Sequence, residues 1–234
     1  MAIEPQPVTE SAAQRYTRVA IALHWAIAVL VLYNLTSGLL KPVLPRPFFM
    51  FHVSSGITIL VLTLVRIGWR LTHRPPPLLP IKPWERRLAR TVHVLLYAAM
   101  LALPLSGWAM VSANPVAAPA SAIAPPARAP QAGSVPGQGG ATMPGGRAKG
   151  QAGPRGPLMV WGLFKLPLIA PLHDMGSTPA GIEQQRAVHD RIEGNHLAGG
   201  WIMIILLVLH ISGALKHQVA DRRQQLQRMG LGRA

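Results

Sequence analysis

Four histidines lie within or beside long apolar stretches, where ionisable side chains are rare. His196 and His210 are 14 residues apart in the last of these stretches, and His24 and His52 lie in the first two. Fourteen residues of α-helix rise roughly 21 Å and come within about 40° of whole turns, so His196 and His210 share one helix face. Ionisable residues inside a membrane span are costly and indicate function. Two imidazoles placed in this way on one helix could each ligate a haem, one near each face of the membrane.

Four apolar stretches could carry these histidines across a bilayer, because each has the roughly 19 to 23 residues that a spanning helix needs. They are Val19–Leu40, Phe49–Leu71, Thr91–Val111 and Leu197–Leu215. Of the 234 residues, 50% are hydrophobic and only 13% are charged, which is typical of a membrane protein. We therefore expect an all-α integral membrane four-helix bundle. Antiparallel neighbours place His24 at the depth of His210 and His52 at the depth of His196, which predicts two bis-histidine b-type haems.

The net charge of +15 indicates the orientation of the chain rather than a nucleic-acid partner. Lysines and arginines gather before the first span, between the second and third, and after the fourth. Short loops rich in these residues stay cytoplasmic, so both termini are predicted to lie on the cytoplasmic side of a bacterial inner membrane. The same charges suit lipid headgroups, and we find no nucleic-acid recognition motif. Cysteine is absent, which excludes cysteine-ligated iron–sulfur clusters and covalent haem attachment.

Cationic and titratable side chains surround the predicted inner haem, between His24 and His210. Arg66 lies 14 residues after His52, so we expect it on the same helix face, near the inner haem. There it could pair with the haem propionates, with Arg70 one turn further on, or it could snorkel to headgroups. His217 lies two turns beyond His210. With Arg70 it is a candidate to bind and protonate a quinone, or it is a solvated histidine at a helix end.

Two further histidines compete for the ligand positions. His93 stands near the cytoplasmic end of the third span, shallower than His24, and is the alternative inner ligand. His189 precedes His196 by seven residues on the same predicted face, so it is the fallback for the outer ligand. Depth favours His210 over His93 as an inner ligand, and His189 lies in a polar segment.

Composition divides the chain into five parts. They are a polar tail (1–14), the first three spans (15–112), a low-complexity insertion (113–157), an interfacial segment with the last span (158–218), and a basic cytoplasmic tail (219–234). The insertion is almost wholly Ala, Pro, Gly, Ser and Gln with scattered basic residues. Such a stretch is expected to be disordered outside the membrane.

Motifs in all four spans resemble, in order, those of the bacterial cytochrome b561 family. They are Arg15-Tyr-Thr-Arg-Val-Ala-Ile-Ala-Leu-His-Trp25, His52-Val-Ser-Ser-Gly-Ile57, Leu64-Val-Arg-Ile-Gly-Trp-Arg70, His93-Val-Leu-Leu-Tyr97, Leu103-Pro-Leu-Ser-Gly-Trp108 and Leu209-His-Ile-Ser-Gly-Ala-Leu-Lys-His217. The resemblance implies a four-helix cytochrome with two b haems, ligated by His24, His52, His196 and His210, that exchanges electrons with ubiquinone. One well-characterised kind of member passes an electron from periplasmic superoxide to ubiquinone. The chain departs from the family in its long insertion and in Gln218, where a second histidine often follows His217.

The leading hypothesis is therefore a dihaem oxidoreductase that moves electrons from a periplasmic donor, superoxide or a redox protein, to ubiquinone. A basic outer surface could steer a small anion, with Lys41, Arg46 and Lys165 as candidates. The alternative is a cytochrome b subunit that anchors a periplasmic dehydrogenase, such as a hydrogenase, to the lipid bilayer. A histidine-based transporter is disfavoured, because the spans contain almost no carboxylates.

Overall fold

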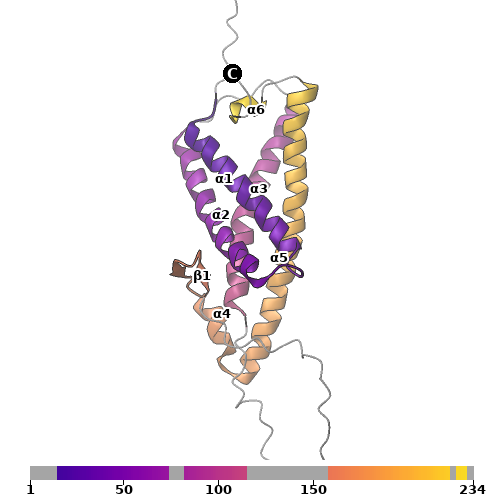
Figure 1. The fold of residues 1–234 in the computed structure, drawn as a ribbon. Coiled ribbons are helices and arrows are strands. Elements are labelled where there is room, and N and C mark those ends of the chain that lie inside the picture. Colours follow the sequence, from indigo (N-terminus) through magenta and orange to yellow (C-terminus); the bar gives the residue numbers. More distant parts are fainter. Residues whose placement is uncertain (1–14, 74–81, 115–157, 222–224, 231–234) are drawn as a thin grey trace, which may run out of the picture.

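The computed structural model describes residues 15–73, 82–114, 158–221 and 225–230. Four long helices dominate it (Figure 1): α1 (Arg18–Leu39), α2 (Arg46–Thr72), α3 (Pro83–Ser112) and α5 (Pro179–Leu215). All four are long and apolar enough to cross a membrane, which confirms the predicted four-helix architecture. We call the end where α1 and α3 begin and α2 and α5 end the terminal end. The opposite end is the loop end.

Two helices begin well before the apolar stretches that predicted them. α3 starts at Pro83 rather than Thr91, and α5 at Pro179 rather than Leu197. Proline suits the first helical position, where its missing N–H would have no helical partner. The Glu85 carboxylate accepts a hydrogen bond from the Lys82 backbone N–H at the start of α3, and Thr178 Oγ1 accepts one from Gly181 N–H at the start of α5. Polar first turns thus extend both helices beyond the hydrophobic segment.

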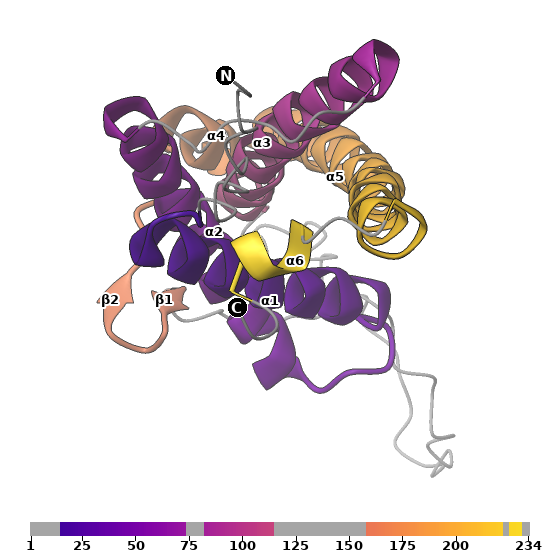
Figure 2. The same ribbon diagram turned by 90° about the horizontal axis from the view of Figure 1, so that it is seen from above.

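The helices pack in sequence, α1 against α2, α2 against α3, and α3 against α5. Seen from the terminal end, α1, α2, α3 and α5 surround the interior of the bundle (Figure 2). A buried apolar cluster fills its middle: Ile27, Val31, Ile59, Val92, Leu96, Met203 and Leu206. Met203 and Leu206 lie between His196 and His210 in the chain. The core therefore separates two histidine-bearing levels.

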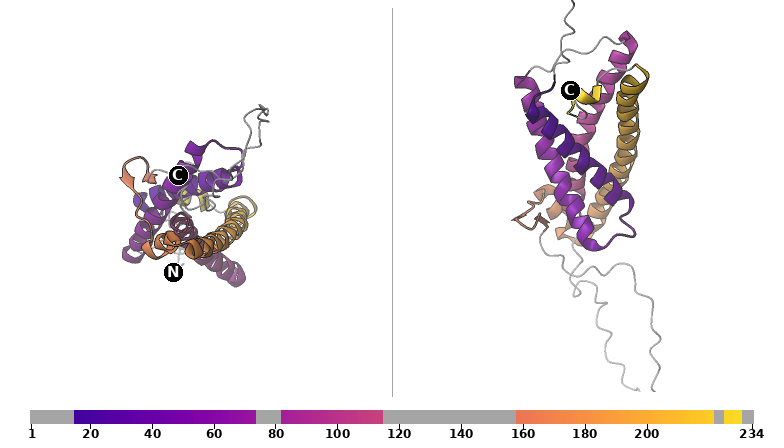
Figure 3. Two further views of the ribbon diagram at one scale, coloured as in Figure 1. Left: turned by 90° about the horizontal axis from the view of Figure 1, so that it is seen from below. Right: turned by 45° about the horizontal axis from the view of Figure 1, so that its top comes forward.

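A short segment covers part of the loop end before α5 begins. It contains the antiparallel strands β1 (Met159–Val160) and β2 (Phe164–Lys165), helix α4 (Ala170–Asp174) and the 3₁₀ turn η2 (Met175–Ser177). Trp108 Nε1 donates to Pro167 O at 2.7 Å, and the backbone N–H of Ile169 donates to Ser112 Oγ at 3.0 Å. These bonds fasten the segment to the end of α3. Figure 3 shows the hairpin projecting from the side of the bundle, seen from the loop end and in a tilted view.

The end of the chain folds back onto the terminal end. After α5 the helix continues as the π-helical segment η3 (Lys216–Ala220), and the short helix α6 (Gln225–Arg228) follows. Trp25 Nε1 donates to Met229 O at 3.0 Å, and Tyr16 N–H to Arg228 O at 3.3 Å. Part of the predicted basic tail therefore contacts α1 (Figure 2). The tail 1–14 and nearly all of the insertion 113–157 lie outside the described residues, so the proposed domain boundaries stay predictions.

Candidate functional site

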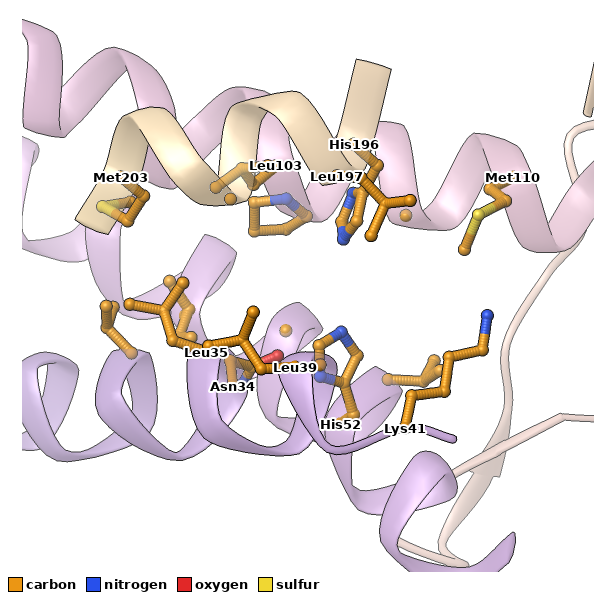
Figure 4. Close-up of a pocket in the computed structure, with 18 of the residues that line it drawn as sticks. Asn34, Leu35, Leu39, Lys41, His52, Leu103, Met110, His196, Leu197 and Met203 are labelled. Atoms are coloured by element: carbon orange, nitrogen blue, oxygen red, sulfur yellow. The ribbon is translucent and has the colours of Figure 1, made fainter. Parts of the chain in front are cut away.

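His52 on α2 and His196 on α5 face each other across the bundle near the loop end (Figure 4). Their ring centroids are 6.4 Å apart, and the ring planes make an angle of 68°. Two imidazoles that bind one metal ion from opposite sides, with each nitrogen about 2 Å from the metal, have centroids about 6 Å apart. The separation therefore leaves room for one metal ion between the two rings. We call these residues the loop-end pair.

A serine orients each ring of the loop-end pair. Ser37 Oγ lies 3.0 Å from His52 Nδ1, and Ser106 Oγ lies 2.9 Å from His196 Nδ1. Each serine hydroxyl donates its own proton to a backbone carbonyl, that of Asn34 for Ser37 and that of Leu103 for Ser106. The oxygen is then an acceptor toward the ring, so Nδ1 carries the proton and Nε2 is left as the metal-binding nitrogen.

Glycines follow both serines and let the rings lie against neighbouring helices. A Cβ atom on Gly38 would stand 3.3 Å from Cε1 of His52, and one on Gly107 would stand 3.3 Å from Cε1 of His196. The rings border a cavity of about 580 Å³, a volume within the range of ligand pockets, about 300–1,000 Å³. Its lining is mainly apolar, with Lys41 and Glu193 among the few charged groups. The cavity and the nitrogen donors fit a flat, largely apolar macrocycle.

A second pair stands toward the terminal end. His24 on α1 and His210 on α5 have ring centroids 6.2 Å apart and an interplanar angle of 67°, so this terminal-end pair matches the loop-end pair. His93 on α3 is closer to His210, with centroids 5.0 Å apart in an edge contact, and its Nδ1 lies 2.7 Å from Ala89 O. A separation of 5.0 Å is too short for a metal ion bound to both rings. His24 is therefore the better partner for His210.

The structure brings together all four predicted ligands in the predicted pairs, while their role as ligands stays a prediction. His189, the fallback for the loop end, lies near Asp190 and Glu193, and ligating atoms of the three residues are within 4.8 Å of one another. It is His196 that faces His52.

Arg66 points into the protein near the terminal-end pair. Its Nε donates to Tyr97 Oη at 3.0 Å, and its NH1 donates to Ala20 O at 2.9 Å. Ala20 lies one turn before His24, so a half-buried positive charge stands beside this pair. The Arg66 guanidinium is therefore bound within the protein and does not extend to the lipid headgroups. Arg70, one turn beyond, is exposed.

His217 belongs to a polar cluster where α5 ends. His217 Nδ1 lies 2.6 Å from Asp221 Oδ2, and Lys216 Nζ contacts Glu85 at 2.6 Å and Asp221 at 3.4 Å. The hydrogen bond from His217, followed by that from Lys216, holds the pKa of the Asp221 carboxyl below its usual range. His217 is only 14% exposed. Lys216 and His217 lie in the π-helical segment η3, and π-helical turns are frequent at functional sites.

The residues that orient the candidate ligands and contact His217 were not predicted from the sequence. Ser106 stands inside a quoted motif, but Ser37 does not, and only the shared Ser-Gly dipeptide could have indicated both. Asp221 lies four residues after His217, a spacing that puts two side chains on one helix face.

Sequence comparisons relate the chain to known proteins. A family model described as prokaryotic cytochrome b561 matches residues 15–232. The chain is 26% identical over 223 residues to cytochrome b561 homolog 2 of Escherichia coli (strain K12), which covers 92% of this chain and 91% of that protein. It is 34% identical over 103 residues to the probable superoxide oxidase CybB of Yersinia pestis, covering 42% of this chain and 58% of that protein. It is 38% identical over 102 residues to cytochrome b562 of Cereibacter sphaeroides, covering 39% of this chain and 63% of that protein.

Proposed function

The chain belongs to the prokaryotic cytochrome b561 family, and we propose that it carries electrons across the membrane from superoxide at the loop end to ubiquinone at the terminal end. It is a multi-pass bacterial membrane protein of a family that binds b-type haem and transfers electrons. The observation that carries the proposal is the presence of two facing histidine pairs, with centroids 6.4 and 6.2 Å apart, at two levels of one bundle.

Each pair is proposed to hold one b-type haem. His52 and His196 would ligate the haem at the loop end, and His24 and His210 the haem at the terminal end. Arg66, with Arg70 beyond it, would pair with the propionates of the terminal-end haem. A bound b-type haem supplies reversible one-electron chemistry at its iron. The protein fixes the ligands, excludes water with the apolar cluster between the levels, and sets the local charge.

The terminal end is proposed to face the cytoplasm. Basic side chains gather there on α1, α2 and α3 and directly after α5, among them Arg18, Arg70, Arg86 and Lys216. Lysine and arginine in short loops and near span ends favour the cytoplasmic side. The loop-end pair then lies near the periplasmic surface, where a short-lived anion can reach it.

The electron donor is proposed to be superoxide. Two superoxide anions lose one electron each and leave as dioxygen, and one ubiquinone gains the two electrons and two protons to become ubiquinol. Lys41 lines the loop-end cavity beside His52 and supports attraction of an anion. The name of the Yersinia protein, a probable superoxide oxidase, supports the same donor. Because this chain spans about 58% of that protein, the likeness supports the donor only in part.

Ubiquinone is proposed to take up its protons near His217. The imidazole lies about 10 Å beyond His210 along α5, and its contact with Asp221 orients the ring through Nδ1. Histidine titrates near neutral pH and can deliver a proton. Arg70 would contribute positive charge nearby.

The proposal is tested with the purified full-length protein in stopped-flow absorbance experiments. We expect superoxide to reduce the haem faster than a dismutase-treated control does, and added ubiquinone to reoxidise it. His217→Ala should slow reoxidation by quinone and leave reduction by superoxide unchanged. His73→Ala is the matched control, because His73 is an exposed histidine at the same end that stacks on Trp69.

Haem reduction no faster than in the dismutase control would refute superoxide as the donor. The better-supported function would then be that of an electron-transfer subunit that anchors a periplasmic dehydrogenase, and a large redox protein should copurify. Equal reoxidation rates in wild type and His217→Ala would refute the role of His217.

A further inference from the structure

We propose that the β-hairpin before α5 is inserted into the lipid bilayer, where its apolar tip anchors the loop-end segment to the membrane. The hairpin comprises β1, β2 and the tip Trp161-Gly162-Leu163. The apolar side chains at and next to the tip are unusually exposed, since Leu163 is 80% exposed, Phe164 51% and Trp161 43%. The partner that fits these side chains is the hydrocarbon of the leaflet at the loop end.

Depth along α2 is the first observation. Trp161 N–H donates to Ser54 Oγ at 3.0 Å, and its indole Nε1 donates to Thr58 Oγ1 at 2.9 Å. These residues follow His52 by two and six positions, which places them about 3 and 9 Å further along the helix from the loop end. Two histidine levels roughly 21 Å apart, centred in a core about 30 Å thick, lie about 5 Å inside its edges. The Trp161 contacts therefore lie within the hydrocarbon region.

Satisfied backbone groups are the second observation. Non-helical backbone is tolerated at membrane depth only where its polar groups have protein partners. Leu163 N–H donates to Val160 O at 2.9 Å, and Leu166 N–H to Leu158 O at 2.7 Å. Trp161 N–H donates to Ser54 Oγ. These three hydrogen bonds lower the cost of placing the hairpin backbone at membrane depth.

The docking hydroxyls are arranged to accept these bonds. Ser54 donates its own proton to Met50 O, and Thr58 donates to Ser54 O. Both oxygens are then acceptors, and both Trp161 nitrogens are donors. Trp161 has a φ of 52°, a left-handed conformation that is strained for a bulky residue and persists where the surroundings hold it. The turn is therefore built around this docking contact.

Continuity with the lipid face of the bundle is the third observation. The Phe51 ring of α2 lies 6.0 Å from the Trp161 ring, and Phe51 is itself exposed. Val61 is an exposed apolar residue further along the same spanning helix. The hairpin side chains extend an apolar surface that already faces lipid.

The chain contains no cysteine, so a single introduced thiol reports one position. Leu163→Cys in the full-length protein is labelled with an environment-sensitive fluorophore and reconstituted in phosphatidylcholine–phosphatidylglycerol vesicles. We expect quenching by lipids that carry a doxyl group on the acyl chain, and protection from aqueous iodide. Val61→Cys, on the lipid face of α2, should behave in the same way. Ser177→Cys, exposed in η2, should be quenched by iodide.

Iodide quenching of position 163 to the level of position 177 would overturn the proposal. Protection from both quenchers would also overturn it, because another part of the protein would then cover the tip. In the double variant Ser54→Ala, Thr58→Val, we expect the label at position 163 to become accessible to iodide. The single variant Thr58→Ser keeps both hydroxyl acceptors and should leave the label protected. The haem absorbance of each variant checks that the bundle is intact. An unchanged label in the double variant would refute the docking contact.

Discussion

At the residue scale, ring separation distinguishes candidate ligands from neighbouring histidines. The rings of His24, His93 and His210 lie close together near the terminal end, and sequence depth alone left His93 open as a ligand. Its ring contacts His210 directly at 5.0 Å, whereas His24 stands 6.2 Å away. Only the longer separation accommodates a metal ion. His93 is thus a packing neighbour of a proposed ligand.

Substitution of either histidine of a pair should remove the one haem that the pair is proposed to hold. Haem content should fall from about two to about one per chain when either member of a pair becomes alanine, because a six-coordinate b haem needs both imidazoles. Potentiometric titration should show loss of the same component in His52→Ala and His196→Ala, and of the other component in His24→Ala and His210→Ala. His93→Ala should keep both components. Loss of a haem in His93→Ala with retention in His24→Ala would reverse the assignment at the terminal end.

The serine contacts carry a separate prediction at the loop end. Ser37→Ala or Ser106→Ala removes an acceptor at Nδ1 of a proposed ligand. The imidazole then becomes a weaker electron donor, so the midpoint potential of the loop-end haem should rise, and its affinity should fall by about 10- to 100-fold. Serine-to-threonine variants at both positions should restore the potential.

Ser212→Ala is the matched control, because Ser212 is an exposed serine two residues after His210. Its potentials should equal those of the wild type. A shift of the terminal-end component in Ser37→Ala would contradict the proposed geometry.

Sequence periodicity predicted which histidines share a level, because both partners lie on regular helices of known rise. It could not predict the partners of Nδ1. Ser37 reaches His52 across a helix–helix contact, and such a contact depends on how far each helix is rotated about its axis. Asp221 is different, since its spacing from His217 was available in the sequence. The contact of Asp221 with His217 was not predicted because the last helix was expected to end near Leu215, before both residues.

At the element scale, hydropathy located the four spanning helices but not their ends. The polar first turns of α3 and α5 are stabilised by capping and by proline at the first position, features to which a hydropathy window is insensitive. The segment after the insertion was expected to lie at the interface, but its hairpin form was not predicted. Two-residue strands are too short to show an alternating pattern. The turn instead depends on Trp161 binding α2.

At the scale of the whole molecule, the two ends of the bundle differ in charge. The terminal end concentrates arginines and lysines, whereas the loop-end cavity has Lys41 beside Glu193. Their contact, Lys41 Nζ to Glu193 Oε1 at 3.1 Å, offsets most of the attraction that Lys41 alone would exert on an anion. The loop end is therefore only weakly cationic around the cavity, and its charge can be changed in either direction by one substitution.

Changing this ion pair should shift the rate of haem reduction by superoxide in opposite directions. Glu193→Gln leaves Lys41 uncompensated and should raise the second-order rate constant, while Lys41→Gln should lower it, because charge near a cavity mouth steers small anions. Lys165→Gln is the control, since Lys165 is exposed on β2 and is not among the residues that line the cavity. Both effects should shrink as salt shortens the Debye length from about 30 Å at 0.01 M to about 10 Å at 0.1 M. The measurement is stopped-flow haem reduction in salt series. Equal rates in both variants at low salt would show that the donor enters elsewhere or carries no negative charge.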